Sequence, residues 1–116
     1  MTKILIPTEY QEGVALVRWA NAKNIPLVHI PNEGKRSYTA AAMLRKTGLR
    51  KGFPDYFLPH VTSQYAGLFV ELKRTRNSKA SIEQLQWIDE LNTRGYRATI
   101  AKGFDEAKQI IEEYLG

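Results

Sequence analysis

Two short apolar runs, separated by a polar connection, constrain this chain more than any other feature. The first is Gly52-Phe53-Pro54-Asp55-Tyr56-Phe57-Leu58, and the second is Gly67-Leu68-Phe69-Val70-Glu71-Leu72-Lys73. Their aromatic and aliphatic residues, with loop residues between them, predict two short β-strands. Each predicted strand carries one carboxylate. Because side chains alternate along a strand, Glu71 and Lys73 share one face, and Asp55 begins the neighbouring strand.

Two carboxylates beside a lysine suit the metal-dependent hydrolysis of a phosphodiester. Carboxylate oxygens bind hard divalent cations, here Mg²⁺ or Mn²⁺, and such a metal can activate water and offset charge on a phosphate. Neighbouring carboxylates also favour the charged form of a lysine. We therefore expect Lys73 to position the attacking water and to stabilise the developing negative charge, rather than to act as a neutral base.

The ordered set of these residues resembles a known nuclease family. A proline-aspartate pair, a spacer and Glu-x-Lys are typical of the PD-(D/E)xK nuclease superfamily, and the fuller string is similar to its VRR-NUC (virus-type replication-repair nuclease) family. The resemblance covers nearly the whole chain. It is carried by Gly52-Phe53-Pro54-Asp55, by Leu68-Phe69-Val70-Glu71-Leu72-Lys73, and by Ser81, Gln84 and Trp87.

The resemblance implies a role for each residue of the motif. Asp55 and Glu71 would bind the metal, with the backbone carbonyl of Leu72 as a further oxygen ligand. Lys73 and Gln84 would orient water against the scissile phosphate. Gln84 has a competing interpretation, because Ser-x-x-Gln is itself a capping box at the start of a helix.

A third carboxylate is expected from the first helix, which Thr8 caps and which runs to about residue 22. The helical period places Glu9 on the same stripe as Leu16, whereas Glu12 lies on its flank. The VRR-NUC resemblance implies a metal-site glutamate near this helix start, and Glu9 matches best. Gly13 stands where many relatives have a glutamine, which leaves Glu12 as an alternative. Either acid could instead stabilise the helix dipole.

The net charge of +5 is concentrated in the middle of the chain. Ten Lys and Arg residues lie between positions 35 and 79, where the only acids are Asp55 and Glu71. This distribution favours binding to a polyanion over an ordinary solvated basic surface. The expected contacts to the DNA backbone are Lys35, Arg36, Arg50, Lys51, Arg74 and Arg76.

The remaining periodicity predicts an α/β fold, with four short strands and helices on both sides. Further strands are expected over 25–30 and 96–101, and helices over about 38–47, 82–93 and 104–115. Trp87 is expected in the core. The second helix should turn Ala40, Met43, Leu44 and Thr47 inward, and the third Ile82, Leu85, Ile88 and Leu91. The resemblance implies a mixed four-stranded sheet with a restriction-endonuclease-like PD-(D/E)xK core.

With 116 residues, the chain is expected to form a single domain, 1–116. It has no cysteine and only two histidines, so a thiolate or His-rich metal centre is excluded. Without a signal peptide or membrane span, a cytoplasmic setting is expected.

Stand-alone domains of this kind resemble phage and bacterial enzymes that form homodimers and cut branched DNA. A metal-dependent endonuclease acting on a Holliday junction or flap is therefore expected. A non-catalytic nucleic-acid-binding module on the same fold is the alternative, and an interaction protein with a mere Glu71–Lys73 ion pair is a further one. The exact DNA substrate and the number of metals, one or two, stay open.

Overall fold

The computed structural model describes residues 6–31, 37–74 and 78–116. Helices and strands follow one another in the predicted order. They are α1 (Glu9–Ala22), β1 (Val28–His29), α2 (Tyr38–Lys46), β2 (Tyr56–Leu58), β3 (Leu68–Lys73), α3 (Ile82–Thr93), β4 (Arg97–Lys102) and α4 (Phe104–Leu115). None of the helices in these ranges is long and apolar enough to cross a membrane.

The strands form one mixed sheet in the order β1-β2-β3-β4. β2 is antiparallel to both β1 and β3, whereas β4 runs parallel to β3 after the α3 crossover. The predicted mixed four-stranded α/β fold is confirmed. β1 is shorter than predicted, since it is an edge strand between Pro26 and Pro31, and proline cannot donate to a strand ladder.

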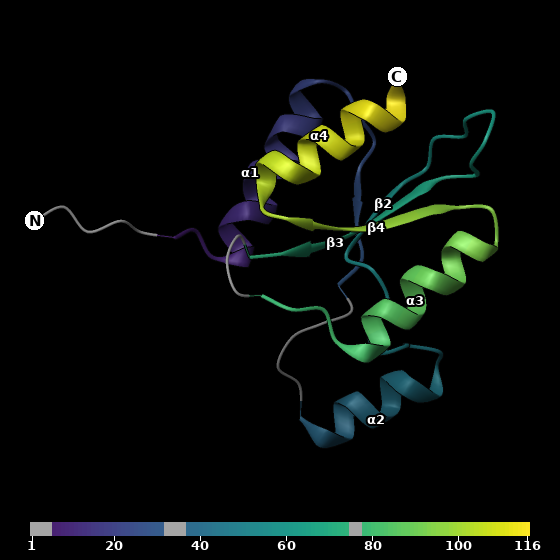
Figure 1. Cartoon of the computed structure of the whole chain (residues 1–116). Helices are drawn as coiled ribbons and strands as arrows, with labels where there is room; N and C mark the ends of the chain where they lie inside the picture. Colours follow the sequence, from purple (N-terminus) through teal and green to yellow (C-terminus); the bar gives the residue numbers. More distant parts are fainter. Residues whose placement is uncertain (1–5, 32–36, 75–77) are drawn as a thin grey trace, which may run out of the picture.

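Helices cover both faces of the sheet (Figure 1). Along β3, Val70 and Leu72 point to the face that α1 and α4 cover, where they pack with Leu16 and Ile111. The alternate residues point to the face that α3 covers. There Phe69 packs with Leu91 and with a layer of rings that includes Phe53 and Trp87, so the predicted core position of Trp87 is confirmed.

Polar side chains define the helix starts as the sequence predicts. Thr8 and Gln11 form a reciprocal capping box at the start of α1, and Ser81 and Gln84 form another at the start of α3. The Ser37 hydroxyl accepts from the amide of Ala40 and caps α2. These caps satisfy backbone N–H groups that a helix leaves without partners in its first turn.

The predicted inner face of α3 is partly wrong. Its buried residues are Gln84 and Leu91, with Ile88 half-buried between them, whereas Ile82 and Leu85 are exposed. Positions 84, 88 and 91 lie on one stripe of a helix. The inward stripe thus begins with a polar residue, and periodicity of apolar residues alone could not find it.

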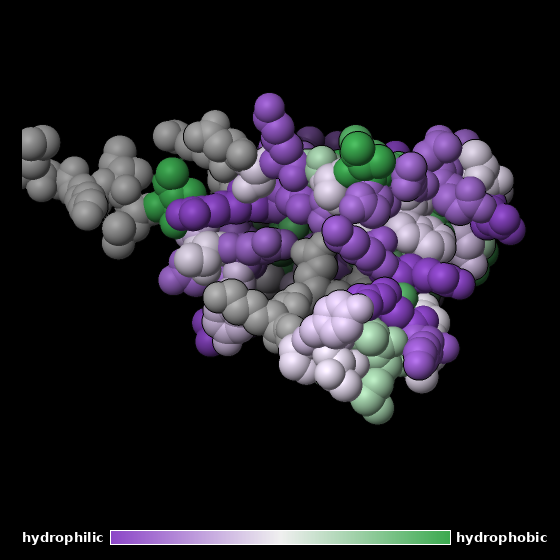
Figure 2. All heavy atoms as spheres, turned by 90° about the horizontal axis from the view of Figure 1, so that it is seen from below, coloured by the Kyte–Doolittle hydropathy of each residue, from purple (hydrophilic) through white to green (hydrophobic). Residues whose placement is uncertain are grey.

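The predicted packing of α2 is wrong. No α2 residue is buried, and the side chain of Met43 is 64% exposed. α2 lies below α3, away from the sheet (Figure 1). Seen from below, a group of white to light-green residues of intermediate to apolar character is surrounded by hydrophilic ones (Figure 2). The amphipathic pattern predicted the helix correctly, but such a pattern does not specify what the apolar side packs against.

Candidate functional site

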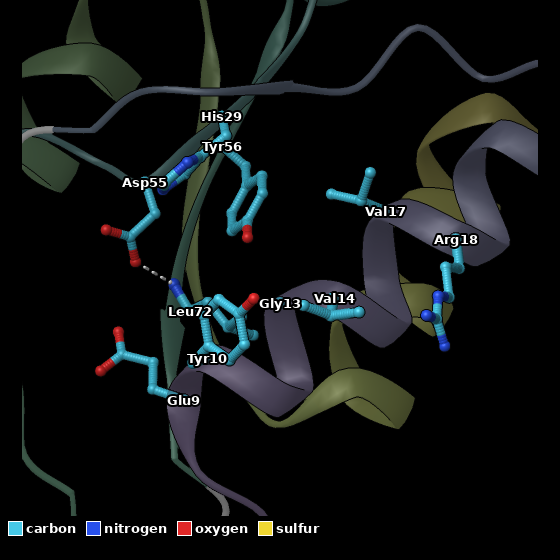
Figure 3. Close-up of a pocket in the computed structure, with 10 residues that line it drawn as sticks. All are labelled: Glu9, Tyr10, Gly13, Val14, Val17, Arg18, His29, Asp55, Tyr56 and Leu72. Carbon is cyan, nitrogen blue, oxygen red and sulfur yellow. Dashed lines mark hydrogen bonds between the residues drawn. The ribbon is translucent and has the colours of Figure 1, made fainter.

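Asp55 is held from both sides at the point where β2 begins. Its carbonyl accepts a hydrogen bond from the amide of Ile30, after β1, at 2.6 Å. Its carboxylate oxygen Oδ2 accepts from the amide of Leu72, in β3, at 2.9 Å (Figure 3). The residue is only 7% exposed. These contacts fix the carboxylate relative to β3.

The strand period places two of the motif residues, Glu71 and Lys73, on one face of β3. Tyr56 of β2 pairs with Val70 of β3, so continuing this antiparallel register by one residue sets Asp55 opposite Glu71. Lys73 lies two residues beyond Glu71 and therefore projects from the same face, the one that α3 covers. Glu71 is fully buried and Lys73 is half-buried. The Asp55 carboxylate lines a cavity together with Glu9, Tyr56 and Leu72, on the side of the sheet that α1 covers.

The backbone carbonyl of Leu72 is directed toward the same edge. The N–H and C=O groups of a strand residue point toward the same neighbouring strand. The Leu72 N–H reaches Asp55, so its carbonyl also points to the β2 side. The residue opposite Leu72 in the continued register is Pro54, which has no N–H to donate. This arrangement leaves the carbonyl without a ladder donor from that residue.

The two acids of α1 have different surroundings. Glu12 is buried, and its carboxylate accepts a hydrogen bond from the amide of Phe104, the first residue of α4. Gly103, the N-cap of α4, offers no side-chain cap, so Glu12 provides it from another helix. Glu9 instead is exposed and lines a cavity together with Asp55. The expectation that Glu9 shares the buried stripe is wrong, because Glu12 occupies it.

The carboxylates of Glu9 and Asp55 lie on the same side of this cavity (Figure 3). Both act on the ring of Tyr56. Burial raises the pKa of the Tyr56 hydroxyl, and the negative charges of Asp55 and Glu9 raise it further. The two acids come from different elements, yet both lie close enough to Tyr56 to disfavour the charged form of its hydroxyl.

Gln84 is buried beside the segment that leads to Asp55. Its Oε1 accepts from the amide of Ser81 at 2.8 Å, so the capping-box interpretation holds. Gly52 packs closely against the first turn of α3: a Cβ there would lie 2.8 Å from the Gln84 amide nitrogen. Because Oε1 is engaged in the cap, a contact of Gln84 with bound water would use its Nε2 group.

Three of the six predicted DNA contacts lie within the described ranges. Arg50, Lys51 and Arg74 are exposed. Lys51 forms an ion pair with Glu83 at 3.3 Å, and the Glu83 pKa is lowered by a backbone hydrogen bond and by Lys51. Arg74 donates to the carbonyl of Ile6 at 3.3 Å. The other three, Lys35, Arg36 and Arg76, lie outside the described residues.

The chemistry of the donors fits a hard divalent cation, with an incomplete protein shell. Across 6–31, 37–74 and 78–116, no three side chains of His, Cys, Asp or Glu are grouped closely enough to hold a metal. The available set comprises the carboxylates of Asp55 and Glu71 and the carbonyl of Leu72. Oxygen donors with several water ligands are the coordination that Mg²⁺ commonly adopts in proteins.

Comparisons with known proteins identify the family and the fold. The family model described as VRR-NUC domain matches residues 7–105. A solved structure described as a "VRR_NUC domain protein" is 26% identical, with a TM-score of 0.84 over 96% of this chain and 90% of that one. A second, described as "VRR_NUC domain", is 23% identical and shares the fold, with a TM-score of 0.55 over 93% and 99% of the two chains. No curated protein matches. The chain belongs to the VRR-NUC domain family and has the nuclease fold of the PD-(D/E)xK type.

Proposed function

We propose that this protein is an endonuclease that hydrolyses DNA phosphodiester bonds with the help of Mg²⁺ or Mn²⁺. The observation that carries the proposal is the anchoring of Asp55 between β1 and β3, beside the end of β3 that bears Glu71 and Lys73. Two carboxylates and a lysine near the end of β3 are the residue types that such a reaction needs. Membership of a nuclease-fold family supports the same conclusion.

Each residue has a distinct part in the proposed reaction. Asp55, Glu71 and the carbonyl of Leu72 would hold the cation, which supplies Lewis-acid activation of water and charge neutralisation at the phosphate. The Lys73 ammonium orients the attacking water and stabilises charge on the phosphate oxygens. Hydrolysis adds the water oxygen to phosphorus and breaks one phosphorus–oxygen ester bond, so the products are a phosphate monoester and a hydroxyl.

Glu9 is the α1 acid assigned to this site, because it lines the same cavity as Asp55 whereas Glu12 is bound to α4. Its carboxylate would reach the cation through water. Gln84 would position water from the α3 side through Nε2. The exposed cations Arg50, Lys51 and Arg74, together with Lys35, Arg36 and Arg76, would hold the sugar-phosphate backbone without reading base sequence.

The preferred substrate is proposed to be branched DNA, a Holliday junction or a flap, cut by a homodimer. Backbone contacts without base readout make selectivity depend on the shape of the DNA. Apolar side chains exposed on α2 and α3, including Met43, Ile82 and Leu85, offer surface that a second copy could cover. Two sites related by a twofold axis could cut two opposed strands.

The nuclease assignment is tested by Lys73→Ala on a panel of branched and linear DNAs with Mn²⁺. Cleavage should fall by at least about a hundredfold, the usual scale for losing one electrostatic stabiliser, while folding and DNA binding persist. Lys102→Ala is the matched control, because Lys102 pairs with Lys73 in the β3–β4 register and carries the same charge. Unchanged cleavage by the Lys73 variant would refute the assignment.

A non-catalytic DNA-binding module is the second candidate. The lack of a three-residue metal group among the described residues favours it. Calorimetric titration with Mn²⁺ separates the two functions: the nuclease takes up Mn²⁺ and loses this uptake in Asp55→Asn, whereas the module binds DNA and takes up none.

A further inference from the structure

The cavity beside Glu9 and Asp55 has a character that metal binding does not explain. It has a volume of about 650 Å³, within the roughly 300–1,000 Å³ typical of sites for small organic groups. Its lining residues come from α1, β1, the start of β2 and the end of β3. They are Glu9, Tyr10, Gly13, Val14, Val17, Arg18, His29, Asp55, Tyr56 and Leu72. Acidic groups occupy only one end, and most of the remaining wall is aromatic or aliphatic (Figure 3).

Aromatic rings are placed where a flat ligand could stack. His29 and Tyr56 lie side by side on β1 and β2, with ring centroids 5.0 Å apart. Tyr10 is 79% exposed at the rim. Gly13 leaves the space that the Tyr56 hydroxyl occupies, because a Cβ at position 13 would lie 2.6 Å from that oxygen. The absence of a side chain there lets the Tyr56 ring lie against α1 and form one wall.

Charge varies along the cavity in a way that matches a nucleotide chain. Glu9 and Asp55 lie at the end where the cation is proposed. Arg18, at the other end, is nine residues further along α1 than Glu9, or about 13 Å at the rise of an α-helix. A nucleotide chain could match these features. Its scissile phosphate would lie at the acidic end, beside the proposed cation, one base would lie between the aromatic and aliphatic walls, and a second phosphate would lie at Arg18.

We propose that this cavity binds one unpaired nucleobase of the DNA strand being cut, next to the scissile phosphate, with Arg18 contacting a neighbouring phosphate. The inference rests on the proposed nuclease function and specifies its substrate class. A flap presents single-stranded bases directly, whereas a base in plain duplex must first be unpaired and unstacked at a cost of a few kcal/mol. Base–aromatic stacking accepts any base, so the cavity selects DNA structure rather than sequence.

The test uses two DNA hairpins with a single-nucleotide bulge, one bearing 2-aminopurine and one an abasic residue at that position. Binding is measured by anisotropy of a terminal label without divalent metal, so that cleavage is not required. The wild-type protein should prefer the base-containing hairpin by about tenfold, the scale of losing one base–aromatic stack. The 2-aminopurine fluorescence should fall on binding. Equal affinities with no fluorescence change would overturn the proposal.

Two variants locate the effect. Val14 is half-buried and belongs to neither core cluster, so Val14→Phe should fill the cavity without unfolding the protein, which a thermal melt checks. It should remove the preference and leave affinity for the abasic hairpin unchanged. Tyr10→Ala should lower the preference, whereas Tyr38→Ala, which removes a similarly exposed tyrosine from α2, should not. Retained preference in Val14→Phe, or equal loss in both tyrosine variants, would contradict the assignment.

Arg18→Gln tests the phosphate contact. The slope of log affinity against log salt concentration should become shallower by about 0.7, the value for one contact to a single strand. An unchanged slope would exclude Arg18. The hairpin measurements can be separated from the nuclease test. A preference for the base-containing hairpin without cleavage in Mn²⁺ would contradict only the nuclease function. Cleavage without that preference would contradict only the cavity proposal.

Discussion

Gly52 should be the position where one added methyl group affects the site most. Its φ is +85°, a conformation that L-residues disfavour by about 1–2 kcal/mol. A Cβ would also lie 2.7 Å from the carbonyl carbon of Glu83 and 2.8 Å from the amide nitrogen of Gln84. Both are backbone atoms of α3, so neither can rotate away. Overpacking of this kind costs about 1–3 kcal/mol, which gives roughly 2–5 kcal/mol in total for Gly52→Ala.

Gly95→Ala is the matched control for this prediction. Gly95 has a similar φ of +94°, but an added Cβ would meet nothing within 4 Å. It should therefore lose only the conformational part, about 1–2 kcal/mol. Urea unfolding of both variants, compared at equal slope, gives the difference that is due to contact with α3. Equal losses in the two variants would refute the close approach of Gly52 to α3.

The same contact links stability to function. Gly52 lies three residues before Asp55, so a displacement that relieves the clash moves either the first turn of α3 or the start of β2. We expect the folded fraction of Gly52→Ala to cleave more slowly than wild type, and that of Gly95→Ala to cleave normally. Rates are corrected for the folded population in each sample.

Three further outcomes follow from the surroundings of the acids and of Tyr56. Glu9→Gln should slow cleavage about tenfold or more and leave the unfolding midpoint unchanged, because Glu9 lines the cavity with Asp55. Glu12→Gln should lower the free energy of unfolding by about 1–2 kcal/mol through its contact with α4 and leave the cleavage rate per folded molecule unchanged. The reverse pattern would assign the α1 acid of the site to Glu12. Asp55→Asn can still accept from Leu72, so it should remain folded and lose Mn²⁺-dependent cleavage. Burial and the charges of Asp55 and Glu9 raise the pKa of Tyr56, so the folded state holds this proton more tightly than the unfolded state does. The free energy of unfolding should therefore fall as pH rises above about 10. Tyr56→Phe should lose less stability than wild type between pH 9 and pH 11, which urea unfolding at the two pH values measures.

Local signals in the sequence were sufficient for most of the fold. Capping boxes and turn residues marked where helices begin, and α1 ends at Ala22 as predicted. Strand alternation also predicted that Glu71 and Lys73 share a face of β3, because it depends on few residues. The roles of those residues stay predictions until the variants are measured.

Contacts between distant segments could not be predicted in the same way. Glu12 was an open alternative to Glu9 because its partner, the amide of Phe104, is 92 residues away in the sequence. A helical wheel shows an acid near an apolar stripe but does not show a second helix that begins beside it. The exposed apolar side of α2 is the converse case, since its pattern predicts burial but none of its residues is buried.

The candidate site lies where the β2–β3 pairing ends before β3 does. β2 begins at Tyr56, whereas β3 continues to Lys73, so the last residues of β3 extend beyond the β2 ladder. At that point Pro54 cannot donate to the carbonyl of Leu72, and Asp55 satisfies the Leu72 amide with a side-chain oxygen instead of a backbone one. One proline and one aspartate therefore end the β2–β3 ladder at this point.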